Sequence, residues 1–322
     1  LVTRTVLKPV SWVWAAVTAW KIARARPAPP RVPVICVGNL TMGGAGKTPV
    51  VDEILRLLTA GGLAAHGLAR GHGGRLTGPV RVDPARHSAA DVGDEPLMLA
   101  GRHPMWISRD RPAGAAAAAA AGASVVVMDD GHQNPSIART ASLVVVDGET
   151  REDEWPFGDG SVFPAGPMHE PLAAGLARAD GVVLLLPADL DAPDPALVKL
   201  FGHLPVLVAR IEPAAPPPPG PQLGFAGVGK PWKVERALKA AGCDLVDFVR
   251  FADHQAWTGP VLEALSEQAA ARQAGLVTTE KDWVRLPAAW RSRIAAWPIR
   301  ARFEDEAALM RLLAPRLAGQ NP

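Results

Sequence analysis

The sequence predicts an α/β protein with a mostly parallel sheet, helices on both faces of that sheet, and a second, smaller α/β domain. Three observations support this prediction. Several strand-like runs are apolar throughout, which is typical of parallel strands that are covered on both sides. These runs alternate with helix-like segments. A proline-rich stretch divides the chain into a longer and a shorter α/β pattern.

Composition excludes several classes of protein. The chain has 322 residues, of which 48% are hydrophobic and 20% charged, as in folded rather than disordered proteins. Its formal net charge of +2 provides no strong field for nucleic acid, so no nucleic-acid partner is expected. The two cysteines, Cys36 and Cys243, lie far apart and form no cluster with histidine. This spacing argues against structural zinc and a disulfide framework, and it is typical of a reducing compartment.

Residues 1–30 are predicted to be an amphipathic segment that associates with a membrane. Trp12, Trp14 and Trp20 occur within a short apolar stretch that is flanked by the basic residues Lys8, Lys21, Arg24, Arg26 and Arg31. The apolar run is shorter than the about 20 residues that a spanning helix needs. A helix packed on the protein's own core would also explain the pattern. The clustering of tryptophan with basic residues favours a helix that lies in the membrane interface.

The larger domain is predicted to comprise residues 31–211. An apolar run at 31–38 predicts a buried strand, and the apolar periodicity that follows predicts a helix ending near residue 59. Two more helices are predicted at 94–100 and 113–121. The remaining strands are predicted at 63–69, 80–82, 105–108, 124–128, 143–146, 181–186 and 204–208, the last of these being the final strand of the domain.

The smaller domain is predicted to comprise residues 223–303, after a stiff proline-rich linker at 212–222. Its pattern alternates strands at 223–227, 243–251 and 275–279 with helices at 231–242 and 259–273. A final helix within 304–318 is expected to pack back on the larger domain. The smaller domain is then placed to close over a cleft.

A glycine-rich bend separates the first strand from its helix, in the stretch "GNLTMGGAGKTP". Glycines allow backbone N–H groups to approach a phosphate, and the following helix presents its positive end to it. Lys47 would reach the β- and γ-phosphates of ATP, and Thr48 would bind Mg²⁺ through its hydroxyl. Thr41 occupies the place where the GxxxxGK[ST] pattern has its first glycine, so a chance glycine-rich turn is the alternative. The predicted nucleotide-binding residues are Asn39, Thr41, Met42, Gly43, Gly44, Ala45, Gly46, Lys47 and Thr48.

A pair of carboxylates follows the apolar strand "SVVVM", as Asp129 and Asp130. Ligands bind at the carboxyl ends of strands in open α/β sheets, so these residues are predicted to hold Mg²⁺. The sequence does not decide which of the two binds the metal directly, but the position of Asp129 next to the strand favours Asp129. An Asp-Gly turn explains Asp130 and Gly131 equally well, but it does not explain the second acid. Together with the bend, this pair indicates a P-loop NTPase-type sheet.

Eight motifs occur in an order that resembles the tetraacyldisaccharide 4'-kinase (lipid A 4'-kinase) family. They are "GNLTMGGAGKTP", "RGHGG", "GDEP", "SRDR", "DDGHQN", "FPAGPMHEP", "FADH" and "TTEKD", and the resemblance extends from the N-terminal segment to about Asp282. Members of that family also lack a glycine at the place of Thr41.

The resemblance implies a membrane-associated enzyme at the cytoplasmic face of the bacterial inner membrane. It would transfer the γ-phosphate of ATP to the 4'-hydroxyl of a tetraacyl glucosamine disaccharide 1-phosphate, with no obligate protein partner. Asp94 matches the proposed base of the family, and His254 matches the histidine that positions the base. On the sequence alone, Asp94 is better explained as an acid at a helix start, and His254 is explained equally well as a surface or capping residue.

Two arginines follow a strand at the sheet end where the bend lies. Of Arg109 and Arg111, one is expected to contact phosphate, and the other to be a solvated residue at the start of a helix. Arg70 is a similar candidate, whereas Gln133 and Glu170 suggest no role. The family usually has arginine where this chain has His169, so a phosphate contact there would be weaker or replaced. Glu280 and Lys281 either face the cleft or form a solvated pair.

Two other functions remain open from the sequence. A P-loop ATPase or synthetase that acts on a soluble substrate would need the same bend but no N-terminal tryptophan cluster. A nucleotide-dependent regulatory switch would need no base for an acceptor, so Asp94 would be dispensable.

Overall fold

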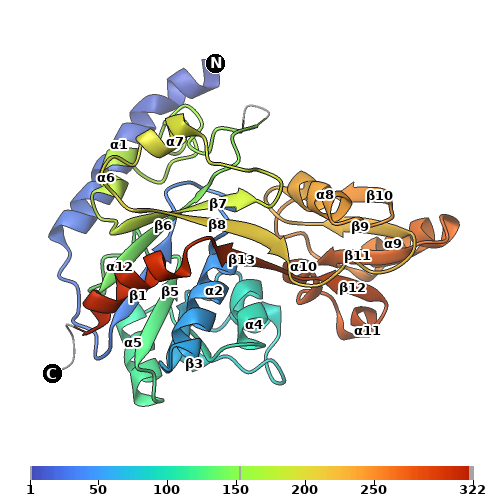
Figure 1. The fold of residues 1–322 in the computed structure, drawn as a ribbon, viewed down its shortest axis with the longest axis horizontal. Coiled ribbons are helices and arrows are strands. Elements are labelled where there is room, and N and C mark those ends of the chain that lie inside the picture. The colour runs from blue at the N-terminus through green and yellow to red at the C-terminus, as the bar shows by residue number, and fades with distance from the viewer. Residues whose placement is uncertain (1, 152–153, 319–322) are drawn as a thin grey trace.

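The protein is described by a computed structural model that covers residues 2–151 and 154–318. Two sheets occur in these residues, and Figure 1 shows the smaller sheet at one end of the molecule. The larger sheet consists of β1 (Val34–Gly38), β2 (Ala65–Ala69), β3 (Val80–Arg81), β4 (Met105–Ile107), β5 (Val125–Asp129), β6 (Ala141–Asp147), β7 (Gly181–Pro187), β8 (Val206–Pro213) and β13 (Ile299–Phe303). The smaller sheet consists of β9 (Gln222–Ala226), β10 (Leu245–Arg250), β11 (Gly275–Thr279) and β12 (Ile294–Trp297).

The larger sheet is mostly parallel, in the order β13-β8-β7-β6-β1-β5-β2-β4-β3. Only the edge strands β3 and β13 pair antiparallel with their neighbours. Every residue of β1, β2 and β5 is buried, as expected for strands that are covered on both faces. The predicted fold class is therefore confirmed.

Helices cover both faces of this sheet. One face packs against α2 (Lys47–Ala60), α4 (Asp94–Ala100) and α12 (Glu306–Ala318) in a single apolar cluster, with Ile54 and Leu309 among its fully buried members. The other face packs against α5 (Arg111–Ala120) near β1 and β5, and against α6 (Leu172–Leu176) and α7 (Pro195–Lys199) near β6 and β7. The short helix α3 (Ala89–Val92) directly precedes α4.

The smaller sheet is entirely parallel, in the order β10-β9-β11-β12. Its apolar clusters include α8 (Pro231–Ala240) on one side and α9 (Gly259–Ala271) on the other. Two short helices, α10 (Glu280–Trp283) and α11 (Ala288–Arg291), connect β11 to β12. We call residues 222–297 the small lobe and the remainder of the described chain the large lobe.

The chain returns to the larger sheet earlier than the sequence suggested. Residues 223–303 were expected in the smaller domain, but β13 at 299–303 pairs with β8 in the larger sheet. Only Pro298 separates β12 from β13, and this short stretch has no turn-like sequence that would indicate two separate strands. The return of the chain to the larger sheet was therefore not recognised from the sequence. The expected linker at 212–222 is also shorter, because β8 extends to Pro213 and β9 begins at Gln222.

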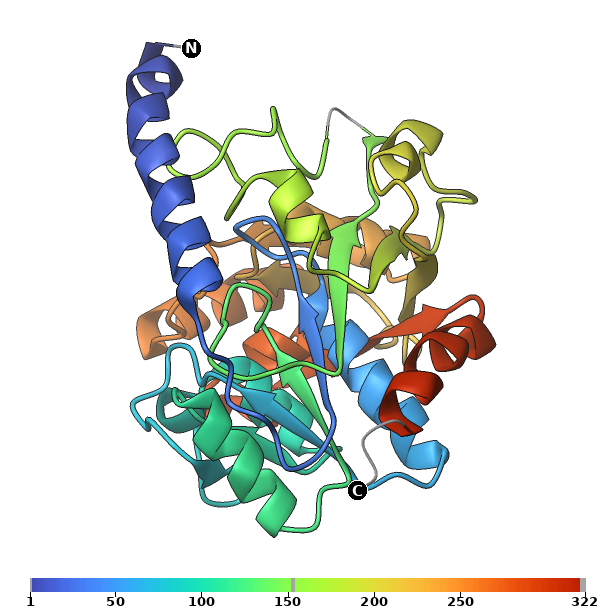
Figure 2. The same cartoon turned by 90° about the vertical axis from the view of Figure 1, so that its left-hand side faces the viewer.

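The N-terminal helix α1 (Val2–Arg24) lies along the large lobe, away from the small lobe (Figure 1). Figure 2 shows that its N-terminal part stands out beyond the rest of the chain. The backbone N–H of Ala165 donates to the Ser11 Oγ at 3.1 Å, and Trp14 Nε1 donates to the carbonyl of His169 at 3.1 Å. Trp14 also meets the ring of Phe163 edge-on. These contacts fix α1 to the segment around residues 163–169.

The contact between Gly38 and His132 allows a test of packing at the centre of the larger sheet. A Cβ on Gly38 would lie 2.5 Å from the Cβ of His132 and 3.1 Å from its backbone nitrogen, so β1 or the segment that follows β5 would have to shift. We expect Gly38→Ala to lower the free energy of unfolding by roughly 1–3 kcal/mol, measured by urea denaturation. Gly259→Ala is the matched control, because its Cβ meets no atom within 4 Å. Equal stability of the two variants would contradict the expectation.

Candidate active site

The bend between β1 and α2 leaves the start of the helix open. Gly43 and Gly46 adopt positive φ angles of 103° and 77°, which glycine adopts without steric cost. Gly46 directly precedes α2, and no side chain caps this helix end. The first N–H groups of a 14-residue helix therefore have no side-chain partner. Free N–H groups and the helix dipole together favour an anion at this position.

Lys47 is held over the bend by two polar partners. Its ammonium donates to Asn39 Oδ1 at 3.1 Å and lies 3.4 Å from Asp130 Oδ1. Asn39 is fully buried, and its amide donates to the carbonyl of Thr41 at 2.6 Å. Asp130 is largely exposed, so a phosphate group can replace it as the partner of Lys47.

A second segment supports the bend from outside. The backbone N–H of Met42 donates to the carbonyl of Pro167 at 2.7 Å, and that of His169 donates to the carbonyl of Leu40 at 2.8 Å. Gln133 and Glu170, for which the sequence suggested no role, act together here. The amide of Gln133 donates to the carbonyl of Asn39 at 2.9 Å and to Glu170 Oε1 at 3.2 Å. Both therefore fix the backbone at the start of the bend.

His169 lies beside the bend. Burial lowers the pKa of its imidazole, the nearby Asp130 opposes this effect, and Lys47 adds to it. The imidazole is therefore neutral at pH 7, so it does not supply the positive charge that an arginine would bring to this place.

Asp129 is a buried carboxylate at the carboxyl end of β5. In the pairing of β1 with β5 it lies opposite Val37, next to the start of the bend. Neither of its side-chain oxygens has a hydrogen-bond partner among the described residues. Burial, and then the nearby Glu95, raise its pKa to about 7. A buried carboxyl group with a raised pKa and no hydrogen-bond partner is suited to bind a cation, which would stabilise its ionised form.

The residues at this position fit Mg²⁺. No group of three or more His, Cys, Asp or Glu side chains that could hold a metal occurs in the part of the chain that the structure describes. Mg²⁺ usually takes one or two carboxylates together with phosphate oxygens and water, so it needs no such group. Asp129, with two unsatisfied oxygens, and Thr48, buried at the start of α2, supply the protein ligands that this coordination requires.

Arg111 begins α5, as one of the two arginines was expected to, but its side chain is buried rather than solvated. Its guanidinium donates to the carbonyls of Asp129 at 3.0 Å and Asp130 at 3.3 Å, and burial lowers its pKa. Arg111 therefore fixes the backbone that carries the two aspartates. Arg109 and Arg70 are exposed, and within residues 2–151 and 154–318 neither side chain has a hydrogen bond or ion pair. Of the three arginines, these two remain free for a phosphate.

Asp94 and His254 come together from the two lobes. Asp94 is the first residue of α4 and is buried, with Oδ1 accepting the N–H of Glu95 at 2.9 Å. His254 belongs to the loop after β10, where it has a positive φ of 57°. Its Nδ1 lies 3.3 Å from Asp94 Oδ2, and its ring contacts that of His72 edge-on. The two residues predicted to work together therefore lie in contact.

Of the two interpretations of Glu280 and Lys281, the structure agrees with side chains that face the cleft, although the sequence did not identify their partners. Lys281 of α10 binds Glu95 with an Nζ–Oε1 distance of 2.9 Å, so it does not form a solvated pair with Glu280. Burial alone would lower the pKa of Lys281, but Glu95 raises it above its ordinary value. Glu280 instead binds Arg102 of the large lobe. The motif "TTEKD" was the sequence feature that pointed to these contacts, because it places Glu280 and Lys281 directly after a predicted strand.

The small lobe also covers the bend itself. A Cβ on Gly229 would lie 3.3 Å from the backbone nitrogen of Gly44. Lys230, which follows, binds Asp147 at the end of β6 with an Nζ–Oδ2 distance of 2.8 Å, and Lys233 binds the same oxygen at 2.8 Å. The lobes are therefore joined on both sides of the phosphate-binding bend.

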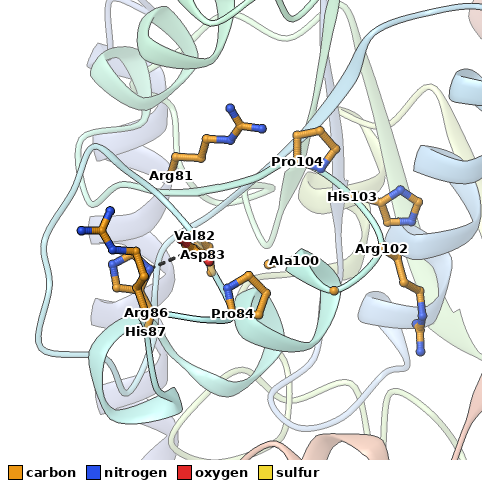
Figure 3. A pocket seen from close by; sticks show the side chains of 11 residues that line it. Arg81, Val82, Asp83, Pro84, Arg86, His87, Ala100, Arg102, His103 and Pro104 are labelled. Carbon is orange, nitrogen blue, oxygen red and sulfur yellow. Dashed lines mark hydrogen bonds between the residues drawn. The ribbon is translucent and has the colours of Figure 1, made fainter.

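A cavity of about 680 Å³ lies elsewhere, at the β3 edge of the larger sheet (Figure 3). Its lining includes Arg81, Arg86 and Arg102, and it contains none of the predicted site residues. Arg102 and His103 come from the segment that follows α4, whereas Asp94 begins that helix (Figure 3). The cavity therefore lies at the opposite end of α4 from the candidate site.

Known proteins resemble this chain over nearly its whole length. Residues 3–318 match the family described as "Tetraacyldisaccharide-1-P 4'-kinase". A protein named tetraacyldisaccharide 4'-kinase from Phenylobacterium zucineum is 68% identical over 307 residues, covering 95% of this chain and 92% of that protein. One of the same name from Caulobacter vibrioides is 66% identical over 312 residues, covering 97% and 93%.

A solved structure has the same fold. It is the crystal structure of the "apo" form of LpxK from Aquifex aeolicus in complex with ATP, with a TM-score of 0.76. The match covers 98% of this chain and 99% of that chain at 23% sequence identity. At this identity the likeness concerns the fold.

The raised pKa of Asp129 makes stability depend on pH in the metal-free protein. Between the ordinary pKa of 3.8 and about 7, the folded state keeps a proton that the unfolded state has released. Stability therefore falls as the pH rises through this range and stays low above it. Asp129→Asn removes the titrating group, so the variant should not lose this stability as the pH rises. The free energy of unfolding of Asp129→Asn minus that of the parent should therefore increase by roughly 2–3 kcal/mol between pH 5 and pH 8, measured by urea denaturation. A difference that is independent of pH would show that Asp129 is already ionised.

Proposed function

The chain belongs to the tetraacyldisaccharide-1-P 4'-kinase family, and from this premise we propose that the candidate site transfers the γ-phosphate of ATP to the 4'-hydroxyl of a tetraacyl glucosamine disaccharide 1-phosphate. The observation that carries the assignment of the site is the contact between Asp94 and His254 beside the phosphate-binding bend. A buried carboxylate that meets a histidine from another lobe is a suitable acceptor for the proton of a sugar hydroxyl.

ATP would bind with its phosphates at the N-terminus of α2. The uncapped N–H groups of the bend would donate to phosphate oxygens. Lys47 would leave Asp130 and contact the β- and γ-phosphates instead. Thr48, Asp129 and Asp130 would hold Mg²⁺, with Asp129 as the direct carboxylate ligand. When bound, Mg²⁺ neutralises charge on the phosphates. Arg70 and Arg109 are the cations left to contact the transferred group.

In the reaction, the 4'-oxygen forms a bond to the γ-phosphorus while the bond from that phosphorus to the β-bridging oxygen breaks. The hydroxyl proton passes to the carboxylate of Asp94, and ADP leaves with the bridging oxygen. His254 keeps the carboxylate directed at the acceptor. A positioned carboxylate contributes most when the small lobe covers the site, because exclusion of water strengthens electrostatic interactions.

The role of Asp94 separates a kinase from a nucleotide-dependent switch. We expect Asp94→Asn to lower kcat at least 100-fold, since it removes the proton acceptor, while the Kd for ATP changes less than threefold. The measurement is transfer of label from γ-labelled ATP to a lipid extract that contains the disaccharide 1-phosphate. Asp194→Asn is the control, because Asp194 caps α7 and contacts none of these residues. Label in water-soluble products alone would instead favour a synthetase or ATPase.

We propose further that α1 binds the surface of the inner membrane on its cytoplasmic side. No helix in the described residues is long and apolar enough to cross a bilayer. One face of α1 exposes a stripe at helical spacing, Val6, Val10, Val13, Val17 and Trp20, which we call the outer stripe. Ser11 on the opposite face is buried against the large lobe. An exposed apolar stripe near basic residues is typical of interfacial helices.

The outer stripe can be tested without deleting α1. We expect Val10→Asp/Val17→Asp to reduce binding to vesicles of phosphatidylethanolamine and phosphatidylglycerol at least tenfold in flotation, because two charges enter the apolar face. Ala19→Asp is the matched control, since it adds a charge to an exposed position of α1 outside the outer stripe. If both variants float like the parent, the outer stripe is not the membrane-binding surface.

A further inference from the structure

The contact between the lobes contains two buried polar atoms that face each other without a hydrogen bond. Asp94 Oδ2 and Arg285 Nε are both buried and make no hydrogen bond among the described residues, although His254 Nδ1 lies 3.3 Å from the same oxygen of Asp94. Oδ2 and Nε lie 3.8 Å apart, about 1 Å beyond the length of a hydrogen bond. A buried polar group without a hydrogen bond is costly, and Arg285 Nε has a carboxylate oxygen as its nearest complementary group. We propose that Arg285 is a positioning residue that holds the carboxylate of Asp94 in its reactive orientation; this inference rests on the proposed role of Asp94.

Arg285 is presented rigidly by the small lobe. Its Nη2 donates to the carbonyl of Gly227 at 2.9 Å and also binds the carboxylate of Asp282. Asp282 is fully buried and is itself fixed by the hydroxyl of Thr279 at 2.7 Å. The guanidinium also lies over the ring of Trp257, with 5.9 Å to its centre. With these contacts made, Nε is the part of the guanidinium that remains directed at Asp94.

His254 is placed differently, which suggests a division of tasks. Its side chain is 47% exposed, whereas that of Arg285 is 11% exposed. An exposed imidazole in a loop with positive φ can turn toward an incoming acceptor. Arg285 cannot leave its position without breaking its bonds to Gly227 and Asp282. Arg285 is therefore the fixed partner of Asp94, and His254 is the partner that faces the acceptor.

The position of Arg285 should influence turnover more than the binding of ATP. A carboxylate that loses its fixed cationic neighbour can turn away from the acceptor, whereas the phosphate-binding bend keeps its own contacts. The other charged or titratable groups near this contact stay in place when Arg285 alone is changed: Glu95 and His72 in the large lobe, and Lys281, Asp253 and His254 in the small lobe.

The test compares Arg285→Gln with Arg291→Gln in the full-length protein. Arg291 is a matched control, because it also donates to backbone carbonyls, at 3.1 and 2.9 Å, and lies over a tryptophan, but it does not contact Asp94. We expect Arg285→Gln to lower kcat about tenfold or more with KM for ATP changed less than threefold, because the carboxylate of Asp94 is no longer held toward the acceptor. Arg291→Gln should leave both kcat and KM for ATP unchanged.

Arg285→Lys keeps the positive charge and should recover part of the lost kcat. It also serves as the second variant if Arg285→Gln does not fold, as judged by thermal unfolding. The proposal is overturned if Arg285→Gln has the kcat of Arg291→Gln, or if Arg285→Lys loses as much kcat as Arg285→Gln. Asp94→Asn in the same assay separates the two levels of inference. If that variant is inactive while Arg285→Gln behaves like Arg291→Gln, the kinase assignment stands and only the positioning role is lost.

Discussion

The site depends on the parallel pairing of β1 with β5. This pairing places Val37 opposite Asp129, so the phosphate-binding bend and the buried carboxylate emerge side by side at one edge of the sheet. A shift of one residue would turn Asp129 to the other face of the sheet and separate it from Thr48. Arg111 and Gln133 act on the backbone at this edge, each binding carbonyls rather than a ligand. The chemistry therefore relies on backbone that is fixed by buried polar side chains.

The same edge is a weak point for stability. Asp129 has no hydrogen-bond partner among the described residues, and Asp94 Oδ2 and Arg285 Nε are unpaired as well. A protein selected for stability alone would fill these positions with apolar or paired groups. The cost is offset by the apolar layers around β1, where α2 contributes fully buried residues such as Ile54 and Leu58. Unsatisfied charge at the centre of a well-packed sheet is what a site needs in order to bind phosphate and metal ion strongly.

Local patterns were sufficient for most of the strands, the bend and the pair Asp129–Asp130, because each of these features is encoded within a few neighbouring residues, but they missed β12 and β13 on either side of Pro298. The partnership of Asp94 with His254 came from the resemblance to a family, since neither residue differs from an ordinary helix or loop residue. Arg285 was missed, and the partner of Lys281 was not identified, because their partners belong to the other lobe and spacing along the chain carries no information about that contact. Arg111 was expected to be either a phosphate ligand or solvated, since sequence does not reveal that its helix start is buried.

Because β13 and α12 follow the small lobe in sequence but belong to the large lobe in space, the large lobe is discontinuous along the chain. A polypeptide that ends at residue 211 would contain the bend and both aspartates. It would lack β13, so β8 would become an unpaired edge strand. It would also lack Phe303, Leu309 and Leu313, which belong to the apolar cluster that α2 packs into. Weak nucleotide binding by such a fragment would therefore reflect an incomplete large lobe and would not show that the bend lacks affinity for nucleotide. A deletion of residues 214–298, with a short linker from β8 to β13, would keep the larger sheet intact. These two strands are already antiparallel neighbours, so a short linker can join them.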